Sequence, residues 1–101
     1  MTLQQLRYYC MACECRNITK AAKRSFVTQP AVTAAIRELE KEFSINLFVR
    51  SKNHVTLTKE GELFYQKAQD MLRYIKESSS ELHDLGRQTP PVRIGIPPLL
   101  S

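Results

Sequence analysis

Residues 19–50, TKAAKRSFVTQPAVTAAIRELEKEFSINLFVR, decide the fold, because they read as two helices joined by a tight turn. We expect Thr19 to be the N-cap of the first helix and the small side chains of Ala21 and Ala22 to let another helix cross closely. The second helix is predicted to begin at Thr28, because a threonine N-cap followed by glutamine and proline suits a first helical turn, whose N–H groups lack intrahelical acceptors. This pattern indicates a helix-turn-helix.

The second helix sorts its residues by face. Its apolar stripe, which must be buried, consists of Val32, Ile36, Leu39 and Phe43. Small, hydrogen-bonding and cationic residues gather at its start and on its outer side: Thr28, Gln29, Pro30, Ala31, Thr33, Ala34 and Arg37. Such a helix can enter the major groove of B-DNA, which is about 12 Å wide, and bring short polar side chains to the base edges. An ordinary amphipathic helix with a solvated outer face would show the same pattern.

The order and spacing of the motifs resemble the LysR-type transcriptional regulator family. The matching runs are Ala21-Ala22, Val27-Thr28-Gln29-Pro30-Ala31-Val32-Thr33, Ile36, Leu39-Glu40, Leu47-Phe48-Val49-Arg50 and Leu57-Thr58-Lys59-Glu60-Gly61. Upstream, the residues similar to the opening helix of the family are Leu3, Leu6, Arg7 and Tyr8-Tyr9. The resemblance implies a mainly α protein, a winged helix-turn-helix followed by a long linker helix, that regulates transcription by binding DNA.

Three positions depart from the family's pattern. Ala34 stands where members often carry arginine or another long polar residue, and Ala35 stands where they often carry glutamine, tyrosine or histidine. An alanine methyl can touch a thymine methyl, but it cannot make a bidentate contact with guanine, so the other polar residues of that face matter more. Ser25 stands where the family usually has leucine, and we expect Phe26 and Val27 to supply the apolar surface that is lost there.

The charge of the chain supports a nucleic-acid partner. Residues 1–60 contain ten Lys or Arg and five Asp or Glu, so the half with the helix-turn-helix carries the whole formal charge of +5. With 101 residues, 43% of them hydrophobic, the chain can bury one modest core, and no apolar run is long enough to span a membrane. The N-terminus does not read as a signal peptide, so we expect a cytoplasmic protein.

Two short runs after the second helix predict the wing. Residues 47–50 and 55–57 are rich in β-branched and aromatic residues and are separated by a polar tip, residues 51–54. We expect a hairpin that packs on the helices and places Arg50 and Lys52 beside DNA phosphates. A solvated basic turn is the alternative for Lys52.

From Thr58 onward the period changes to that of one long helix, which we expect to end at Gly86. Its apolar seam, with four- and three-residue spacings and two flanking residues, predicts a dimerisation surface: Phe64, Tyr65, Ala68, Met71, Leu72, Ile75, Leu82 and Leu85. We expect the seam to need a partner helix, because about 40 Å of helix cannot be buried against so small a domain. The resemblance implies a homodimer with antiparallel linker helices, which would read a near-palindromic operator, and the full-length protein could form a tetramer.

The sequence divides into three parts. We assign residues 1–58 to the winged helix-turn-helix domain, 59–87 to the linker helix, and 88–101 to a proline hinge and a first strand. In the family, that strand would begin an effector-binding domain, so we expect a fragment of a longer regulator. No cofactor is expected in this fragment, whereas a small-molecule effector is expected for the C-terminal domain.

The cysteines allow other functions. Cys10, Cys13 and Cys15 could form a metal or redox site, but Leu6, Cys10 and Cys13 share one helical face, which favours core packing. A thiol- or metal-responsive winged-helix sensor and a pure dimerisation module therefore remain alternatives to a DNA-binding regulator. An enzyme is not expected, because the sequence has no phosphate-binding glycine loop and no recognisable catalytic spacing.

Overall fold

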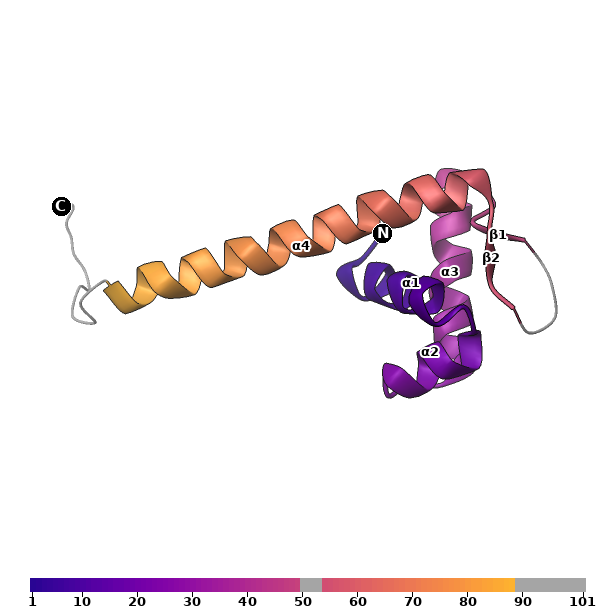
Figure 1. The fold of residues 1–101 in the computed structure, drawn as a ribbon, viewed down its shortest axis with the longest axis horizontal. Helices are drawn as coiled ribbons and strands as arrows, with labels where there is room; N and C mark the ends of the chain where they lie inside the picture. The colour runs from indigo at the N-terminus through magenta and orange to yellow at the C-terminus, as the bar shows by residue number, and fades with distance from the viewer. Residues whose placement is uncertain (50–53, 89–101) are drawn as a thin grey trace.

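The computed structural model describes residues 1–49 and 54–88. In chain order its elements are α1 (Leu3–Cys15), α2 (Ile18–Arg24), α3 (Gln29–Phe43), β1 (Phe48–Val49), β2 (Thr56–Leu57) and α4 (Lys59–Gln88). The three shorter helices and the two strands gather around the first half of α4, and the second half of α4 projects away from them (Figure 1). The fold is mainly α, a winged helix-turn-helix followed by a long helix, as the sequence predicted.

Helix α1 forms the centre of the core. It begins with a capping box, in which the Thr2 hydroxyl accepts from the Gln5 amide and the Gln5 side chain accepts from the Thr2 amide. Its inner face buries five residues: Leu6, Tyr9, Cys10, Ala12 and Cys13. Helices α2, α3 and α4 all pack against this helix, so α1 joins the helix-turn-helix to the long helix.

Helix α2 begins at Ile18, two residues before the predicted position. Its N-cap is Asn17, whose side-chain oxygen accepts from the amide of Lys20 at 2.9 Å, so the prediction that Thr19 caps this helix is wrong. Asparagine is one of the best N-cap residues, which explains why it takes the role two positions earlier. Ala21 and Ala22 are buried and allow the close packing of α2 that the sequence predicted.

The turn between α2 and α3 contains an unusual phenylalanine. The amide of Phe26 donates to the Lys23 carbonyl and the amide of Val27 donates to the Ala22 carbonyl, which is a Schellman ending for α2. Phe26 itself has φ 58°, in the left-handed region, and its side chain is 94% exposed. The prediction that Phe26 fills space left by Ser25 is therefore wrong, whereas Val27 does pack partly against the core.

Phe26→Gly is expected to raise the free energy of unfolding by about 0.5–1 kcal/mol, because glycine avoids the steric cost of the left-handed region and loses only part of that gain to chain entropy. Urea denaturation followed by circular dichroism would measure the change. Phe26→Ala is the matched control, since it removes the exposed ring but keeps a β-carbon. Equal stabilisation by both variants would contradict the conformational explanation.

Helix α3 is the predicted second helix of the motif. The Thr28 hydroxyl accepts from the amide of Ala31 at 3.3 Å, which confirms Thr28 as the N-cap. Val32, Ile36 and Leu39 are at most 4% exposed, as predicted. Phe43 is 41% exposed, so its predicted burial is wrong. It lies in the last turn of α3, where its ring contacts Phe64 from one side at a centroid distance of 5.6 Å.

The wing is a short antiparallel hairpin. Phe48 pairs with Leu57 and Val49 with Thr56, which confirms the predicted strands, although each is only two residues long. One carboxylate oxygen of Glu40 accepts from the amides of Leu47 at 2.8 Å and Phe48 at 3.5 Å. Glu40 thereby fixes the start of the hairpin to α3. Arg50, at the end of the first predicted run, and residues 51–53 of the predicted tip at residues 51–54, including Lys52, lie outside the described residues.

Helix α4 joins the domain at a close contact with the wing. The Thr58 hydroxyl accepts from the amide of Gly61 at 2.9 Å and caps the helix as predicted. A β-carbon at Gly61 would lie 2.1 Å from the carbonyl oxygen of Leu47, so only glycine fits there. The Tyr9 hydroxyl donates to the Gly61 carbonyl at 2.6 Å, and the Tyr9 ring contacts Phe48 and Phe64 at centroid distances of 5.4 and 5.2 Å.

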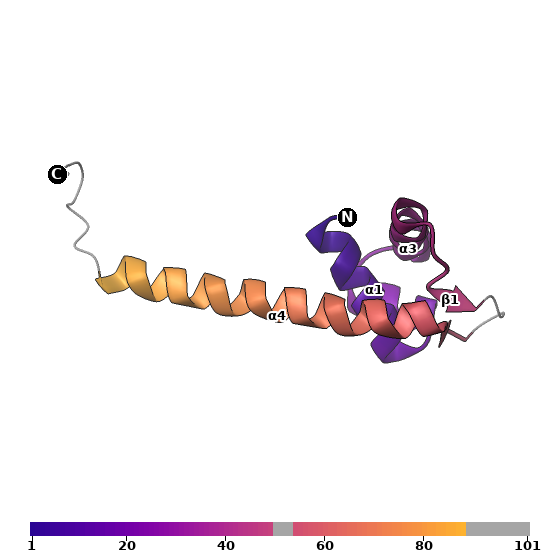
Figure 2. The same ribbon diagram turned by 90° about the horizontal axis from the view of Figure 1, so that it is seen from above.

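The far end of α4 differs from the prediction. Gly86 does not end the helix, which continues to Gln88. Glycine inside a helix costs only about 1 kcal/mol, which a helix of this length tolerates. Seen from above in Figure 2, no other described element lies beside the last turns of α4. Among the described helices, none has the length and apolar composition needed to cross a membrane.

Candidate nucleic-acid interface

The outer face of α3 presents most of the predicted DNA-binding residues together. Thr28, Gln29, Pro30, Ala34 and Arg37 are exposed, whereas Ala31 and Thr33 are partly buried. A shallow hollow on this face is lined by Gln29, Pro30, Thr33, Ala34, Arg37 and Glu38. Since the opposite face of the helix is buried, this is the side of α3 that a duplex could approach.

A residue of α2 contributes to the same corner. The Thr19 hydroxyl lies 3.4 Å from the side-chain oxygen of Gln29 and donates to it. Thr19 is exposed and is not needed as a cap, because Asn17 serves α2 in that role. Sequence reasoning missed this contact, since no local pattern indicates which residue of α2 will lie beside the first residue of α3.

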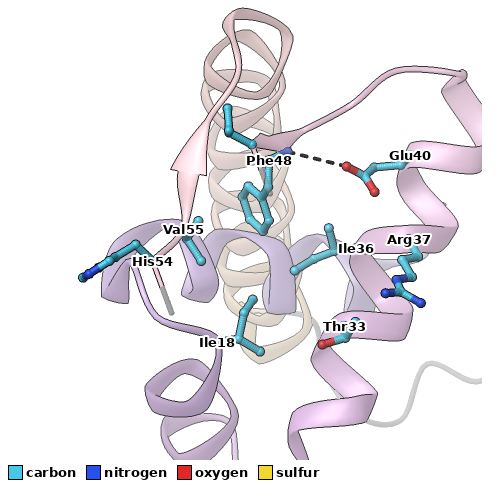
Figure 3. A pocket seen from close by; sticks show the side chains of 9 residues that line it. Ile18, Thr33, Ile36, Arg37, Glu40, Phe48, His54 and Val55 are labelled. Atoms are coloured by element: carbon cyan, nitrogen blue, oxygen red, sulfur yellow. Dashed lines mark hydrogen bonds between the residues drawn. The ribbon is translucent and has the colours of Figure 1, made fainter. Parts of the chain in front are cut away.

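A second hollow separates α3 from the wing (Figure 3). Its volume is about 170 Å³, and its lining residues are Ile18, Thr33, Ile36, Arg37, Glu40, Phe48, Val49, His54 and Val55. Thr33 and Arg37 border both hollows, so they lie between the outer face of α3 and the wing. The amide of Val55 donates to the Arg16 carbonyl at 3.2 Å, which ties the returning strand of the wing to the end of α1.

The electrostatics of the helix-turn-helix favour an anionic partner. Exposed cations follow α2 and α3: Lys20, Lys23, Arg24, Arg37 and Lys41. Two of the three glutamates in α3 that could oppose phosphate are occupied within the chain. Glu40 accepts from backbone amides of the wing, and Glu42 pairs with the N-terminal amine of Met1. Glu38 remains on the rim of the outer hollow.

The predicted dimerisation seam divides into two halves. Phe64, Tyr65, Ala68, Met71 and Leu72 pack against the core of their own chain, and Ala68 is fully buried. Helix α1 lies against the first half of α4 and covers the other four only in part, so their pairing with a partner helix stays a prediction.

The second half of the seam stays at the surface. Ile75, Leu82 and Leu85 are 41%, 66% and 59% exposed. An apolar hollow beside Ile75, between the start of α1 and the middle of α4, is lined by Met1, Thr2, Leu3, Leu6, Asp70, Met71, Tyr74 and Ile75. The exposed apolar residues and this hollow thus lie on the middle and far parts of α4.

The cysteines belong mainly to the core. Cys10 and Cys13 are 5% and 6% exposed, which confirms that they share the buried face of α1 with Leu6, and Cys15 is partly buried. Burial raises the pKa of the Cys10 thiol to about 11 and that of the Cys13 thiol to about 12. Because the thiolate is the reactive form, both groups are almost entirely unreactive thiols at neutral pH. Among the described residues, no group of His, Cys, Asp and Glu is arranged to hold a metal ion.

Iodoacetamide at pH 7.5 is expected to modify Cys15 and to leave Cys10 and Cys13 free, because their raised pKa values and burial suppress the thiolate. Mass spectrometry should then find one adduct on the folded chain and three after unfolding in guanidinium. Raising the pH toward 9 should increase labelling of Cys10 and Cys13 by about tenfold per pH unit. Rapid labelling of either residue at pH 7.5 would support a thiol sensor instead.

Comparison with known proteins gives consistent matches. Residues 3–62 match the family model for bacterial regulatory helix-turn-helix proteins of the lysR family. The HTH-type transcriptional regulator CysL of Bacillus subtilis (strain 168) is 36% identical over 78 residues, which cover 77% of this chain and 26% of that protein. The Hca operon transcriptional activator HcaR of Escherichia coli (strain K12) is 32% identical over 98 residues, 97% of this chain and 33% of that protein. The chain thus spans about a quarter to a third of the length of these relatives.

Solved structures agree with the sequence matches. The crystal structure of the BenM DNA-binding domain with catB site 1 DNA is 34% identical, with a TM-score of 0.82 over 85% of this chain and 96% of that chain. The CbnR DNA-binding domain in complex with DNA is 30% identical, with a TM-score of 0.81 over 85% of this chain and 99% of that chain.

Proposed function

Because the chain belongs to the lysR family of bacterial regulatory helix-turn-helix proteins, we propose that it is the sequence-specific DNA-binding part of a transcriptional regulator. The observation that carries this proposal is the outer face of α3, where hydrogen-bonding and cationic side chains are exposed above a buried apolar face. The two similar structures solved as DNA complexes support a duplex as the partner.

In this proposal α3 enters the major groove by its N-terminal half. The residues that approach the bases or the groove walls are Thr28, Gln29, Pro30, Ala31, Thr33, Ala34 and Arg37. Arg50 and Lys52, which lie outside the described residues, are proposed to contact phosphates, as the sequence predicts. Phosphate contacts supply affinity that falls steeply with salt, whereas contacts with base edges supply the sequence preference.

We further propose that two copies pair through the projecting half of α4. Exposed Ile75 and Leu82 and the hollow between α1 and α4 provide the apolar surface that a second helix would cover. In a dimer with two-fold symmetry, the two copies of α3 would contact two half-sites related by the same symmetry, so the operator would be nearly palindromic. A tetramer of the full-length protein stays a prediction.

The role is that of a regulator and not of an enzyme, in keeping with the transcriptional regulators that the chain resembles. We place it in the cytoplasm, where a bacterial regulator meets DNA. The assignment of residues 1–58 to DNA binding and 59–87 to the linker belongs to the same proposal, as does a small-molecule effector for a further domain. Of the predicted hinge and strand at residues 88–101, Gln88 is the last residue of α4, and residues 89–101 lie outside the described residues.

Selection of bound sequences from a random duplex pool, repeated at two salt concentrations, tests the proposed function. A two-fold symmetric motif is the expected result, and it would also supply the operator. Enrichment of duplexes without any motif would mean that charge alone drives binding. No retention of DNA at either salt concentration would contradict a DNA-binding function altogether.

Gln29→Ala is expected to lower affinity for the selected operator by about 5- to 150-fold, because a good base contact contributes about 1–3 kcal/mol. Binding to unrelated duplexes should change little, since phosphate contacts do not involve this side chain. Electrophoretic mobility shifts on both duplexes would measure the two effects. Equal losses on operator and unrelated DNA would remove Gln29 from the base-reading residues.

A further inference from the structure

The first residue of the recognition helix is held by the helix before it. Thr19, in the first turn of α2, donates its hydroxyl to the side-chain oxygen of Gln29 at 3.4 Å. Both side chains are exposed, so the contact forms at the surface that the proposed function turns toward DNA. Because the Asn17 side chain already caps α2, the Thr19 hydroxyl is available for Gln29.

In the structure this contact gives the planar amide of Gln29 a direction, with its oxygen facing the Thr19 hydroxyl. The oxygen and nitrogen of a glutamine side chain lie on opposite sides of the amide, so orienting one orients the other. With its oxygen directed toward Thr19, Gln29 turns its NH₂ group away from α2. The group that Gln29 then presents to a ligand is a hydrogen-bond donor.

The direction matters for base recognition. A freely turning glutamine commonly reads adenine, donating to N7 and accepting from the N6 amino group. Guanine instead offers two acceptors, N7 and O6, on its major-groove edge. A glutamine that presents only its NH₂ group therefore fits guanine better than adenine.

We propose that Thr19 is a positioning residue that makes Gln29 a donor-only reader, so that the chain prefers guanine to adenine at the base pair facing Gln29. The inference rests on the proposed function and adds to it a base identity and a residue outside the recognition helix. Thr19 acts through the orientation of another side chain, and the proposal requires no base contact of its own.

The experiment begins with the selected operator and the Gln29→Ala variant, which identifies the base pair that Gln29 faces. Affinities are then measured for duplexes with G·C or A·T at that pair, using the wild-type chain, Thr19→Val and Thr19→Ser. Valine is nearly isosteric with threonine but has no hydroxyl, and serine restores the hydroxyl. Thr56→Val, at an exposed position of β2, is the matched control for the chemical change. Circular dichroism and thermal melting establish that each variant is folded.

The wild-type chain and Thr19→Ser should prefer guanine to adenine by about tenfold. Thr19→Val should lose this preference or reverse it, because the Gln29 oxygen is then free to accept from adenine N6. In a Gln29→Ala background, Thr19→Val should have no further effect on the base preference. If Thr19 only supported the fold, its effect would not depend on whether Gln29 is present.

Three results would overturn the inference while leaving the proposed function intact. They are a wild-type preference for adenine at this pair, a guanine preference that Thr19→Val leaves unchanged, and an operator with no base pair sensitive to Gln29→Ala. If the wild-type chain selected no motif at all, the proposed function would fail and this inference with it. Whether the wild-type chain selects a motif therefore distinguishes failure of this inference from failure of the proposed function.

Discussion

Gly61→Ala is expected to destabilise the chain by at least about 3 kcal/mol, a large share of the about 5–15 kcal/mol that stabilises a typical domain. The added β-carbon would lie 2.1 Å from the Leu47 carbonyl oxygen, so α4 or the wing must move. The Leu47 carbonyl also accepts from the amide of Thr58, and the Gly61 carbonyl accepts from Tyr9. Movement at this point therefore disturbs both the cap of α4 and its bond to α1.

Urea denaturation followed by circular dichroism would measure the loss. Gly86→Ala is the matched control in the same helix, because a β-carbon there meets nothing within 4 Å. That substitution should stabilise the exposed helix by about 0.5–1 kcal/mol, since alanine is the better helix former. Similar effects from the two substitutions would mean that the contact with Leu47 is not the cause.

The double substitution Ile75→Glu and Leu82→Glu is expected to give a monomer and to lower operator affinity by about 10²- to 10⁴-fold. Both side chains lie on the exposed half of the seam, and a buried glutamate pair would make association with a second helix costly. Binding of two linked recognition helices exceeds that of one by a factor of this order, so loss of pairing removes the gain. Analytical ultracentrifugation and mobility shifts would measure the two effects.

Leu63→Glu is the matched control for this variant. Leu63 is 56% exposed on the same helix but lies outside the seam. The control should remain dimeric and bind the operator as the wild-type chain does. A monomeric control, or a double variant that still dimerises, would contradict pairing through the second half of α4.

Much of the fold could be predicted because its determinants are local in sequence. Thr28 caps α3 through an amide three residues ahead, and Val32, Ile36 and Leu39 are buried at helical spacing. The wing could be predicted as well, since two β-branched runs flank a polar turn. These features depend on interactions within a few residues or on one periodicity.

The features that the sequence did not predict depend on tertiary contacts. The first half of the seam packs in part against the core of its own chain, and Ala68 is fully buried there, which the helical spacing alone did not indicate. Two residues near the start of α2 could cap it, and the spacing of the sequence did not indicate that Asn17 would do so in place of Thr19. The bond between Thr19 and Gln29 joins residues ten positions apart, which neither periodicity nor capping rules indicate.

The junction at Tyr9 and Gly61 also has a mechanical consequence. It clamps α4 to α1 through a hydrogen bond and ring contacts, so the projecting part of α4 is a lever arm rooted in the DNA-binding domain. From Met71 to Gln88 this arm is about 25 Å long, and a tilt of about 10° displaces its end by about 4 Å relative to the recognition helix. One base-pair step along DNA is about 3.4 Å. If two copies pair through this arm, as proposed, a tilt this small would shift α3 of one copy by about one base-pair step relative to α3 of the other.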